Sequence, residues 1–289
     1  MGAEDFEETG MARATTPPAS KTASKGKGQR EAAGEPRMDQ SAIEAVDRAG
    51  RILFALAASP RESSLLEVAN RAGLSKPTAF RILATLVAEG LATQNRETAS
   101  YRLGVLPLGL ASSVLQSIPV RSIAHPIMTS IRDKVNETVV LAVRDHDFRV
   151  NVDAVEALNA ISQNQQIGFP IPLYAGATSR VFLAAMEPQE LAAYLDRTPL
   201  QSYSETTITE RARLEGEVAR VRKQGFALST AEFTVGSIAV ARIIRNRAGQ
   251  PIAAMHVSIP RSRASEDLIE RCAAALKAGV EALERAIAA

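Results

Sequence analysis

The sequence is poor in the residues on which several classes of protein depend. Its 289 residues include one cysteine, Cys272, which excludes both an intramolecular disulfide framework and a cysteine zinc cluster. Its three histidines, His125, His146 and His256, are scattered, and no two of them form the i, i+4 pair with which a helix binds zinc. We therefore expect no metal site.

Long apolar runs and a large net charge are missing as well. No apolar run approaches the roughly 18 residues that cross a bilayer, and the N-terminus lacks the apolar core of a signal peptide. The sequence therefore predicts a soluble, cytoplasmic protein without a membrane partner. The net charge at pH 7 is only +2, so any binding of nucleic acid must come from a local basic patch.

Motifs of the common enzyme classes are absent. The sequence contains no G-x-S-x-G, no phosphate-binding loop and no dinucleotide-binding fingerprint. Cys272 shares the apolar side of the last expected helix with Ile269, Ala273 and Leu276, which is typical of a small core residue and not of a nucleophile. We expect no catalytic residue and no cofactor, although a cavity in the second domain would leave an enzyme as an alternative.

The N-terminal third divides into a tail and a small domain. Residues 1–39 are rich in Ala, Thr, Gly, Pro and Lys, which predicts a disordered tail. Residues 40–104 contain three helical patterns followed by two short strands, "LATQN" and "YRLG", around a polar turn. The first pattern places six apolar residues on one stripe: Ile43, Val46, Ala49, Ile52, Leu53 and Leu56. In the second, Ser63 or Ser64 is the expected N-cap, and Gly73 follows the last turn. Three helices and a hairpin are the outline of a winged helix-turn-helix.

The third helix, within "LSKPTAFRILATLVAEGLATQN", has two different faces. Ser75 is suited to the N-cap, and Pro77 lies in the first turn, where its missing N–H costs little. The apolar face carries four residues expected in the core: Ala79, Ile82, Leu83 and Leu86. The other face has cations near the helix N-terminus and no carboxylate before Glu89, which favours contact with phosphate and guanine.

We therefore expect this helix and the hairpin to bind double-stranded DNA. Arg96 at the hairpin tip and Arg102 on its second strand can reach a minor groove or the backbone. The full set of predicted contacts is Ser75, Lys76, Pro77, Thr78, Phe80, Arg81, Thr85, Arg96 and Arg102. A three-helix bundle with a solvated cationic face is the alternative interpretation, and the succession of helix, short turn, helix and hairpin favours DNA binding.

The rest of the chain predicts a linker helix and an α+β domain. Residues 105–118 form a mostly apolar helix that we expect to pack against a second copy or the neighbouring domain. Residues 119–289 alternate between β-branched runs and helical patterns, with one hairpin turning at Asp145–Asp147, a helix capped by Thr209, and a second hairpin ending in "PIAAMHVSIP". This pattern indicates an antiparallel sheet flanked by helices.

The last strand places polar groups on a side that otherwise looks buried. Since side chains alternate along a strand, Ile252, Ala254, His256 and Ser258 share one side, and Ala253, Met255, Val257 and Ile259 share the other. The partner strand has Ser237, Ala239 and Ala241 on one face, and these small residues leave room. A mostly apolar cavity with a few polar groups suits a small ligand. The alternative is a hydrogen-bonded core histidine.

Several segments in the same order resemble the IclR family of bacterial transcriptional regulators. "LLEVANRAGLSKPTAFRILATLVAEGLATQNRETASYRLG" looks like the family's winged helix-turn-helix. "IPLYAGATSRVFLA" and "KQGFALSTAEFTVGSIAVARIIRNRAGQPIAAMHVSIP" are similar to segments of its effector domain. The resemblance covers about residues 41–289. It implies a GAF-like effector-binding and oligomerisation domain, a small-molecule effector, and self-association into dimers or tetramers.

The resemblance also implies which residues face the effector. They are Gln163, Ile171, Ala177, Thr178, Ser229, Ser237, Ala239, His256 and Ser258. Ala177 and Thr178 would offer backbone N–H groups at a helix start, which bind anions. Where the family has glycine-lysine this chain has Ser179-Arg180, and the direction of Arg180 is open. Ser229 stands at the family's acidic position, with Glu232 three residues later. Losing a carboxylate and gaining His256 would suit an acidic or phenolic effector.

The sequence therefore predicts a ligand-responsive transcriptional regulator, more in the manner of a repressor, that binds an operator, a small-molecule effector and a second copy of itself. Two other classes stay open, an enzyme and a DNA-binding protein whose second domain serves only for oligomerisation.

Overall fold

The structure is a computed structural model that describes residues 43–59, 61–159 and 165–288. The chain divides into two compact units between Ser113 and Val114, and each unit is described by itself. The predicted tail at 1–39 and Gln163 lie outside the described residues. None of the described helices is long and apolar enough to cross a membrane.

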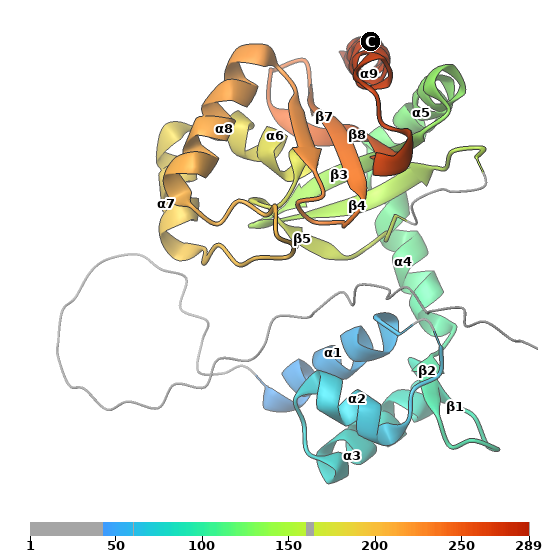
Figure 1. Ribbon diagram of the computed structural model, residues 1–289. Coiled ribbons are helices and arrows are strands. Elements are labelled where there is room, and N and C mark those ends of the chain that lie inside the picture. Colours follow the sequence, from blue (N-terminus) through green and yellow to red (C-terminus); the bar gives the residue numbers. More distant parts are fainter. Residues whose placement is uncertain (1–42, 60, 160–164, 289) are drawn as a thin grey trace, which may run out of the picture. The chain divides into compact units, whose positions relative to one another are not determined.

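The first unit has the predicted three helices and hairpin (Figure 1). Its elements are α1 (Glu44–Ala57), α2 (Leu65–Ala72), α3 (Lys76–Ala88), β1 (Ala92–Gln94) and β2 (Tyr101–Leu103). The core draws on every one of them, and its buried members include Ile52, Leu56, Val68, Ala72, Ala79, Leu83, Leu86, Ala92 and Tyr101. The three helices therefore hold the hairpin in place through a shared apolar cluster.

Capping residues set the turn between α2 and α3. Ser64 and Glu67 form a capping box at the start of α2, in which each side chain bonds the other residue's backbone N–H. Gly73 ends α2 with a φ of 64°, a conformation that favours glycine. The Ser75 hydroxyl accepts a hydrogen bond from the Thr78 N–H at 3.3 Å. The predicted caps are confirmed here, with Ser64 as the cap of α2.

The apolar stripe of α1 is shorter than predicted. Ile52 and Leu56 are buried, but Ile43 and Val46 are 69% and 67% exposed. The first turn of α1 lies beyond the cluster that α2 and α3 complete, so periodicity alone overstated the buried face. The linker helix is α4 (Leu106–Gln116), and none of its residues is buried.

The second unit is a six-stranded antiparallel sheet with helices on both faces (Figure 1). Its strand order is β5-β4-β3-β8-β7-β6, formed by β3 (Thr138–Asp145), β4 (Phe148–Val155), β5 (Pro170–Pro172), β6 (Ala227–Thr230), β7 (Ser237–Arg245) and β8 (Pro251–Pro260). The helices are α5 (Pro119–Val135), α6 (Ala177–Ala185), α7 (Pro188–Arg197), α8 (Arg211–Gln224) and α9 (Glu266–Ala288). The α+β prediction is confirmed.

Two apolar clusters lie on opposite faces of this sheet. One joins the sheet to α5 and α9 and contains Met255, Val257 and Ile259 of β8, and the other joins it to α6, α7 and α8 and contains Ala254. The predicted alternation along β8 is therefore confirmed from Ala253 onward. Ile252 differs and packs against the first cluster, because the ladder shifts register near Arg245 and Pro251.

Three local features of the second unit were not predicted from the sequence. The strands β5 and β6 are only three and four residues long and were missed. The N-cap of α8 is Glu210, and its side chain makes no capping bond, so the assignment of Thr209 as the cap was wrong.

Candidate nucleic-acid interface and ligand site

The outward face of α3 is free of acidic groups over its first turn. Ala79, Leu83 and Leu86 are buried, whereas the exposed residues predicted to contact DNA are Ser75, Lys76, Pro77, Phe80, Arg81 and Thr85. Thr78 is half-buried, because its hydroxyl lies against that of Ser75 at 2.8 Å. Phe80 is 53% exposed, so it is not a core residue of its own unit.

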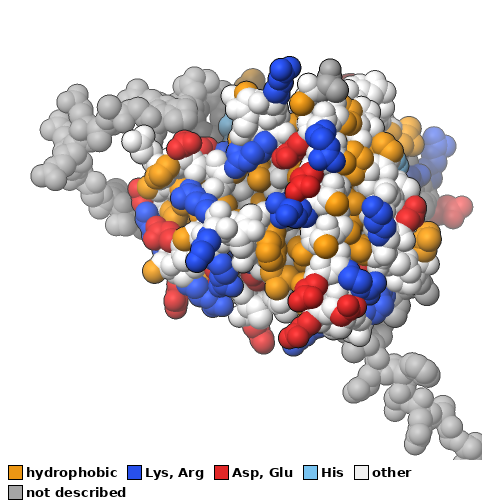
Figure 2. All heavy atoms as spheres, turned by 90° about the horizontal axis from the view of Figure 1, so that it is seen from above, with side chains coloured by type: hydrophobic (Ala, Val, Ile, Leu, Met, Phe, Trp, Pro, Cys, Tyr) orange, Lys and Arg blue, Asp and Glu red, His pale blue; other side chains and the backbone are white. Residues whose placement is uncertain are grey.

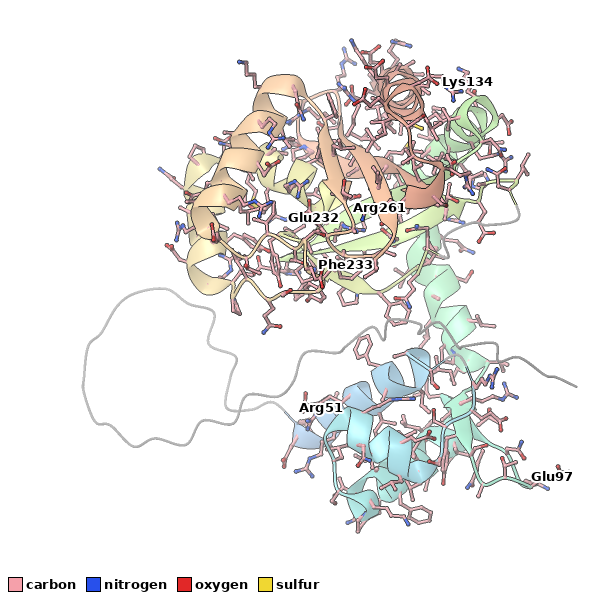
Figure 3. All side chains as sticks on the ribbon, viewed as in Figure 1. Arg51, Glu97, Lys134, Glu232, Phe233 and Arg261 are labelled. Carbon is pink, nitrogen blue, oxygen red and sulfur yellow. The ribbon has the colours of Figure 1, made fainter. Side chains whose placement is uncertain are left out.

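The hairpin between β1 and β2 is organised by polar side chains. Asn95 Oδ1 accepts hydrogen bonds from the N–H groups of Glu97 and Thr98 at 2.9 and 3.3 Å, which closes the turn. Arg96 is exposed beside Glu97, which lies at the free end of the hairpin in Figure 3. This hairpin presents cationic and anionic groups together.

Glu62 is a residue of this surface that the sequence analysis missed. Its carboxylate accepts hydrogen bonds from Ser100 Oγ at 2.6 Å and Asn95 Nδ2 at 3.0 Å and lies 3.7 Å from Arg102 Nε. The Ser100 hydroxyl is the first cause that lowers the pKa of Glu62. Glu62 thus stabilises the hairpin through these hydrogen bonds and partly neutralises the positive charge of Arg102. No spacing rule in the sequence relates it to the hairpin, which is almost forty residues further along the chain.

Because the net charge of the molecule at pH 7 is only +2, any binding of DNA must depend on local surfaces such as these. Figure 2 shows blue and red side chains interspersed over the face that it presents, without a broad patch of one sign among the described residues there.

Most of the residues predicted for the effector meet at one small cavity of the second unit. Its volume is about 40 Å³, and it lies between the start of α6, the loop from β6 to β7, and the strands β7 and β8. Seven of the predicted residues line it: Ala177, Thr178, Ser229, Ser237, Ala239, His256 and Ser258. Ile171 is buried but does not line this cavity.

The start of α6 forms one wall of the cavity. Gly176 is the N-cap, with a φ of 85° that favours glycine, and no side chain caps the helix. The first N–H groups of a helix lack partners within it and carry partial positive charge. Ala177 and Thr178 therefore present the groups that bind anions in other helices.

Arg149 on β4 lines the same cavity and was missed by the sequence analysis. It is only 6% exposed; its Nε donates to Ser179 Oγ at 3.0 Å, and its Nη1 donates to Asn151 Oδ1 at 2.6 Å. Burial lowers the pKa of this guanidinium to about 10, which leaves it charged at neutral pH. The signal was present, because "FRVN" places Arg149 and Asn151 two residues apart in an otherwise apolar strand.

His256 lies deep in this site as a neutral imidazole. It is 4% exposed, and its Nδ1 has no hydrogen-bond partner among the described residues. Burial first, and then the positive charge of Arg149, lower the pKa of His256 to about 3. The imidazole is buried, as the alternative interpretation held, but it is not hydrogen-bonded at Nδ1.

The opposite wall of the cavity is the loop from β6 to β7, which an ion pair between Arg180 and Glu232 holds in place. Arg180 is 1% exposed and binds the carboxylate of Glu232 and the carbonyl of Leu228, so it does not point to solvent. The Glu232 carbonyl accepts hydrogen bonds from Thr207 Oγ1 at 2.6 Å and Ser204 Oγ at 3.2 Å.

Phe233 follows Glu232 in this loop (Figure 3). The centroid of its ring lies 5.1 Å from the centroid of the Tyr203 ring. Glu232 itself lines the cavity. The prediction that this site had lost its carboxylate was therefore wrong, because Glu232 supplies one from a neighbouring position.

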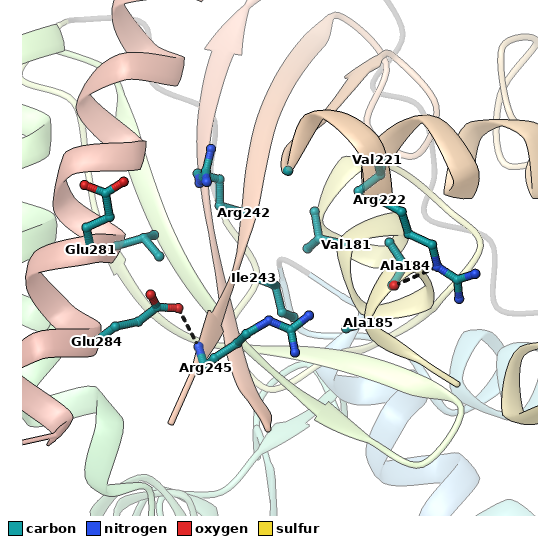
Figure 4. Close-up of a pocket in the computed structure, with 12 residues that line it drawn as sticks. Val181, Ala184, Ala185, Val221, Arg222, Arg242, Ile243, Arg245, Glu281 and Glu284 are labelled. Atoms are coloured by element: carbon teal, nitrogen blue, oxygen red, sulfur yellow. Dashed lines mark hydrogen bonds between the residues drawn. The ribbon is translucent and has the colours of Figure 1, made fainter. Parts of the chain in front are cut away.

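A larger cavity, of about 330 Å³, lies elsewhere in the second unit, between α6, α8, β7 and α9 (Figure 4). Its charged groups are largely engaged with the backbone: Arg222 donates to the carbonyls of Ala184 and Met186, and Glu284 accepts from the Arg245 N–H at 2.8 Å. Of the residues predicted for an effector, none that the structure describes lines it.

Both units match one family of known proteins. Residues 45–96 match the IclR helix-turn-helix domain, and residues 112–285 match the C-terminal domain of the bacterial transcriptional regulator IclR. The acetate operon repressor of Salmonella typhimurium is 29% identical over 242 residues, which cover 83% of this chain and 88% of the repressor.

Two further relatives agree with this match. An HTH-type transcriptional regulator of Mycobacterium tuberculosis is 32% identical over 218 residues, which cover 75% of this chain and 82% of that protein. The crystal structure of IclR from Thermotoga maritima is 27% identical, with a TM-score of 0.67, and covers 86% of this chain and all of that one. The chain belongs to the IclR family of bacterial transcriptional regulators, which join a DNA-binding helix-turn-helix to an effector-binding domain.

Proposed function

We propose that this regulator is a cytoplasmic repressor that binds its operator as a dimer or tetramer and responds to a small acidic metabolite. In this proposal α3 lies in the major groove, with Lys76, Phe80 and Arg81 toward the DNA. The hairpin contacts the backbone or minor groove through Arg96 and Arg102. The acidic metabolite binds in the cavity at the start of α6.

The observation that carries this proposal is the chemistry of the cavity. Arg149 is a buried cation, the first turn of α6 supplies N–H groups without a side-chain cap, and His256 Nδ1 is unpartnered. Burying a charge without a counter-charge costs several kcal/mol, on the order of the whole stability of a domain. Such an arrangement is explained if an anion completes it.

A change in operator affinity follows if the acid prefers one conformation of the cavity walls. The loop 231–236 is held by Glu232 and Phe233, and an acid that enters beside them alters their contacts. The effect on DNA binding can be no larger than the difference in the acid's affinity for the two conformations.

The experiment is an operator titration with and without acids. Genomic fragments retained by the full chain would be sequenced, and the enriched site would be labelled for fluorescence anisotropy. We expect tight binding at moderate salt and a weaker affinity when a small carboxylic acid is added. Enrichment of no sequence would contradict the operator prediction, and tighter binding with the acid would contradict the prediction that the acid releases the operator.

A further inference from the structure

Arg149 lacks an acidic partner because of a bulge in β4. In a regular strand, Asp153 would lie on the same face as Arg149 and Asn151, since its position differs by an even number of residues. The register shifts so that Ala142 pairs with Asn151 while Leu141 pairs with Asp153. The extra residue turns Asp153 to the other face of the sheet, where its carboxylate binds His125 Nδ1 at 2.9 Å.

The side chains around the cavity consequently carry a net charge of +1. No carboxylate of the described residues lies within the 4 Å that would make an ion pair with Arg149. Arg180 and Glu232 cancel one another, and His256 is neutral at pH 7. Among the described residues that line the cavity, Glu232 is the one acidic residue. The charge that remains is the +1 of Arg149, which matches a single negative charge on a ligand.

Glu232 adds a second requirement. Its Oε2 binds Arg180, and its Oε1 has no hydrogen-bond partner among the described residues. An ionised carboxylate oxygen only accepts hydrogen bonds. A ligand that places a second acceptor beside Oε1 is therefore repelled, whereas a hydroxyl group placed there donates a hydrogen bond. Hydrogen bonds to charged groups contribute about 1.5–3 kcal/mol, on the order of a tenfold to hundredfold preference.

The volume limits the size of the ligand. A dry cavity that accepts benzene measures about 150 Å³, and one water needs about 10–15 Å³. At about 40 Å³, the cavity that the described residues form suits an acid of a few carbon atoms better than an aromatic ring.

We propose that the effector is a small aliphatic hydroxy acid, whose one carboxylate pairs with Arg149 and whose hydroxyl donates to Glu232. This inference rests on the proposed function and narrows its effector class from acids in general to acids with a hydrogen-bond donor. It makes Arg149 and Glu232 the two specificity-determining residues of the site.

Matched probes separate the two requirements. Glycolate and acetate differ by one hydroxyl group, and glycolate and glycolamide differ in charge. Benzoate tests the size of the cavity. Sodium salts at equal ionic strength, with sodium chloride as the reference, would be added to the full chain, and the melting temperature would be followed. Ligands that bind only the folded state raise it by mass action.

We expect glycolate and its homologue lactate to raise the melting temperature. Each should do so at a concentration at least tenfold lower than the matched acid without a hydroxyl group needs for the same rise. Glycolamide and benzoate should have no effect. Equal effects of glycolate and acetate would overturn the role of Glu232, and binding of the amide as well as the acid would overturn the role of Arg149.

Two variants test the residues themselves. Arg149→Gln should weaken binding of the hydroxy acid at least tenfold, and Arg149→Lys should recover part of it, because the charge is restored without the planar fork. Glu232→Gln should reduce the preference for hydroxy acid over plain acid, a readout that a merely structural role would not move. Arg220→Gln and Glu215→Gln, both exposed on α8, are the matched controls.

Operator binding distinguishes the two levels of the proposal. A chain that binds its operator and responds to acids without a hydroxyl group refutes the hydroxy-acid inference alone. A chain that binds its operator but responds to no acid refutes the proposed acidic effector.

Discussion

At the scale of single residues, the burial of His256 has a direct consequence for stability. Its pKa is about 3 in the folded chain and about 6.5 in the unfolded chain. Below pH 6.5 the unfolded chain binds a proton that the folded chain does not bind. The free energy of unfolding therefore falls as the pH decreases from 6.5 toward 3. Above pH 6.5 the imidazole is neutral in both states, so protonation of His256 costs no stability there.

We predict that His256→Gln makes stability less dependent on pH. Between pH 6.5 and 5.0 the wild-type chain should lose about 1.7 kcal/mol more than the variant, since the unfolded imidazole is half protonated at pH 6.5 and the loss approaches about 1.4 kcal/mol per pH unit below it. Urea titrations at the two pH values measure this difference. His146→Gln, at a side chain that is 92% exposed, should behave as the wild type does. Equal pH dependence in all three chains would show that His256 ionises normally.

Arg81 offers a second prediction at this scale. Arg81→Ala should weaken operator binding by about 1–3 kcal/mol if the guanidinium contacts a guanine, and relax selectivity at that base pair. Anisotropy titrations with the operator and with point variants of it measure both effects. Arg220→Ala, on the second unit, serves as the control. A loss that is uniform over all sequences would instead indicate a phosphate contact.

Prediction from the sequence succeeded for residues whose surroundings follow from alternation or helical period. His256, Ser258, Ser237 and Ala239 share one cavity because they alternate along two paired strands. It missed Arg149 and left the direction of Arg180 open, because Ser179, Glu232 and Leu228, which bind them, lie on other elements. The isolation of Arg149 depends on a bulge, and no local pattern in "FRVNVDAVE" reports one.

At the scale of elements, the long helices and strands were predictable and the short ones were not. The helices α3 and α8 and the hairpins of β3 with β4 and of β7 with β8 have caps or long periodic runs. By contrast, β5 and β6 pair through only a few residues at the two edges of the sheet, so their sequences carry no alternation long enough to detect. Such strands form because a neighbouring strand is already in place.

Gly104, between β2 and α4, leads to a prediction about the first unit. Its N–H bonds the Leu91 carbonyl at 2.9 Å, and a Cβ atom here would lie 2.1 Å from the Gly90 carbonyl oxygen. Because that neighbour is backbone, it cannot turn aside. Gly104→Ala should destabilise this unit by about 1–3 kcal/mol or more.

Thermal unfolding followed by circular dichroism, together with operator affinity, measures the effect of Gly104→Ala. Gly109→Ala in α4, where a Cβ atom would meet nothing within 4 Å, should be neutral or stabilising. Equal melting temperatures of the Gly104 variant and the wild type would mean that the chain from β2 into α4 shifts without cost.

At the scale of the whole molecule, the apolar surface of α4 indicates self-association. Leu110 and Val114 lie one turn apart, and they are 59% and 60% exposed. Leu106 and Leu108 are 51% and 71% exposed. Contiguous exposed apolar side chains mark interaction surfaces. From residues 105–118 we predicted packing against a second copy or the neighbouring domain, and of these two we expect α4 to pack against α4 of a second copy.

Replacing Leu110 and Val114 together by Asp should convert the assembly to a smaller species or a monomer, since two carboxylates would have to be buried at the contact. Light scattering after size exclusion measures the mass. Leu158→Asp, at a loop residue that is 75% exposed, should leave the mass unchanged. An unchanged mass for the double variant would place the contact between copies elsewhere.

The burial of Cys272 makes the regulator convenient for spectroscopy. Its side chain is completely inaccessible to solvent, and burial raises the pKa of its thiol to about 12. At pH 7.5 very little of this thiol is therefore ionised, and thiolates are the species that react with maleimide dyes. Since the chain has no other cysteine, a cysteine introduced at Thr98 in the hairpin would take the dye selectively. Two dyes on one assembly would then report the distance between its hairpins, and any change in that distance on addition of a hydroxy acid, without removal of the native thiol.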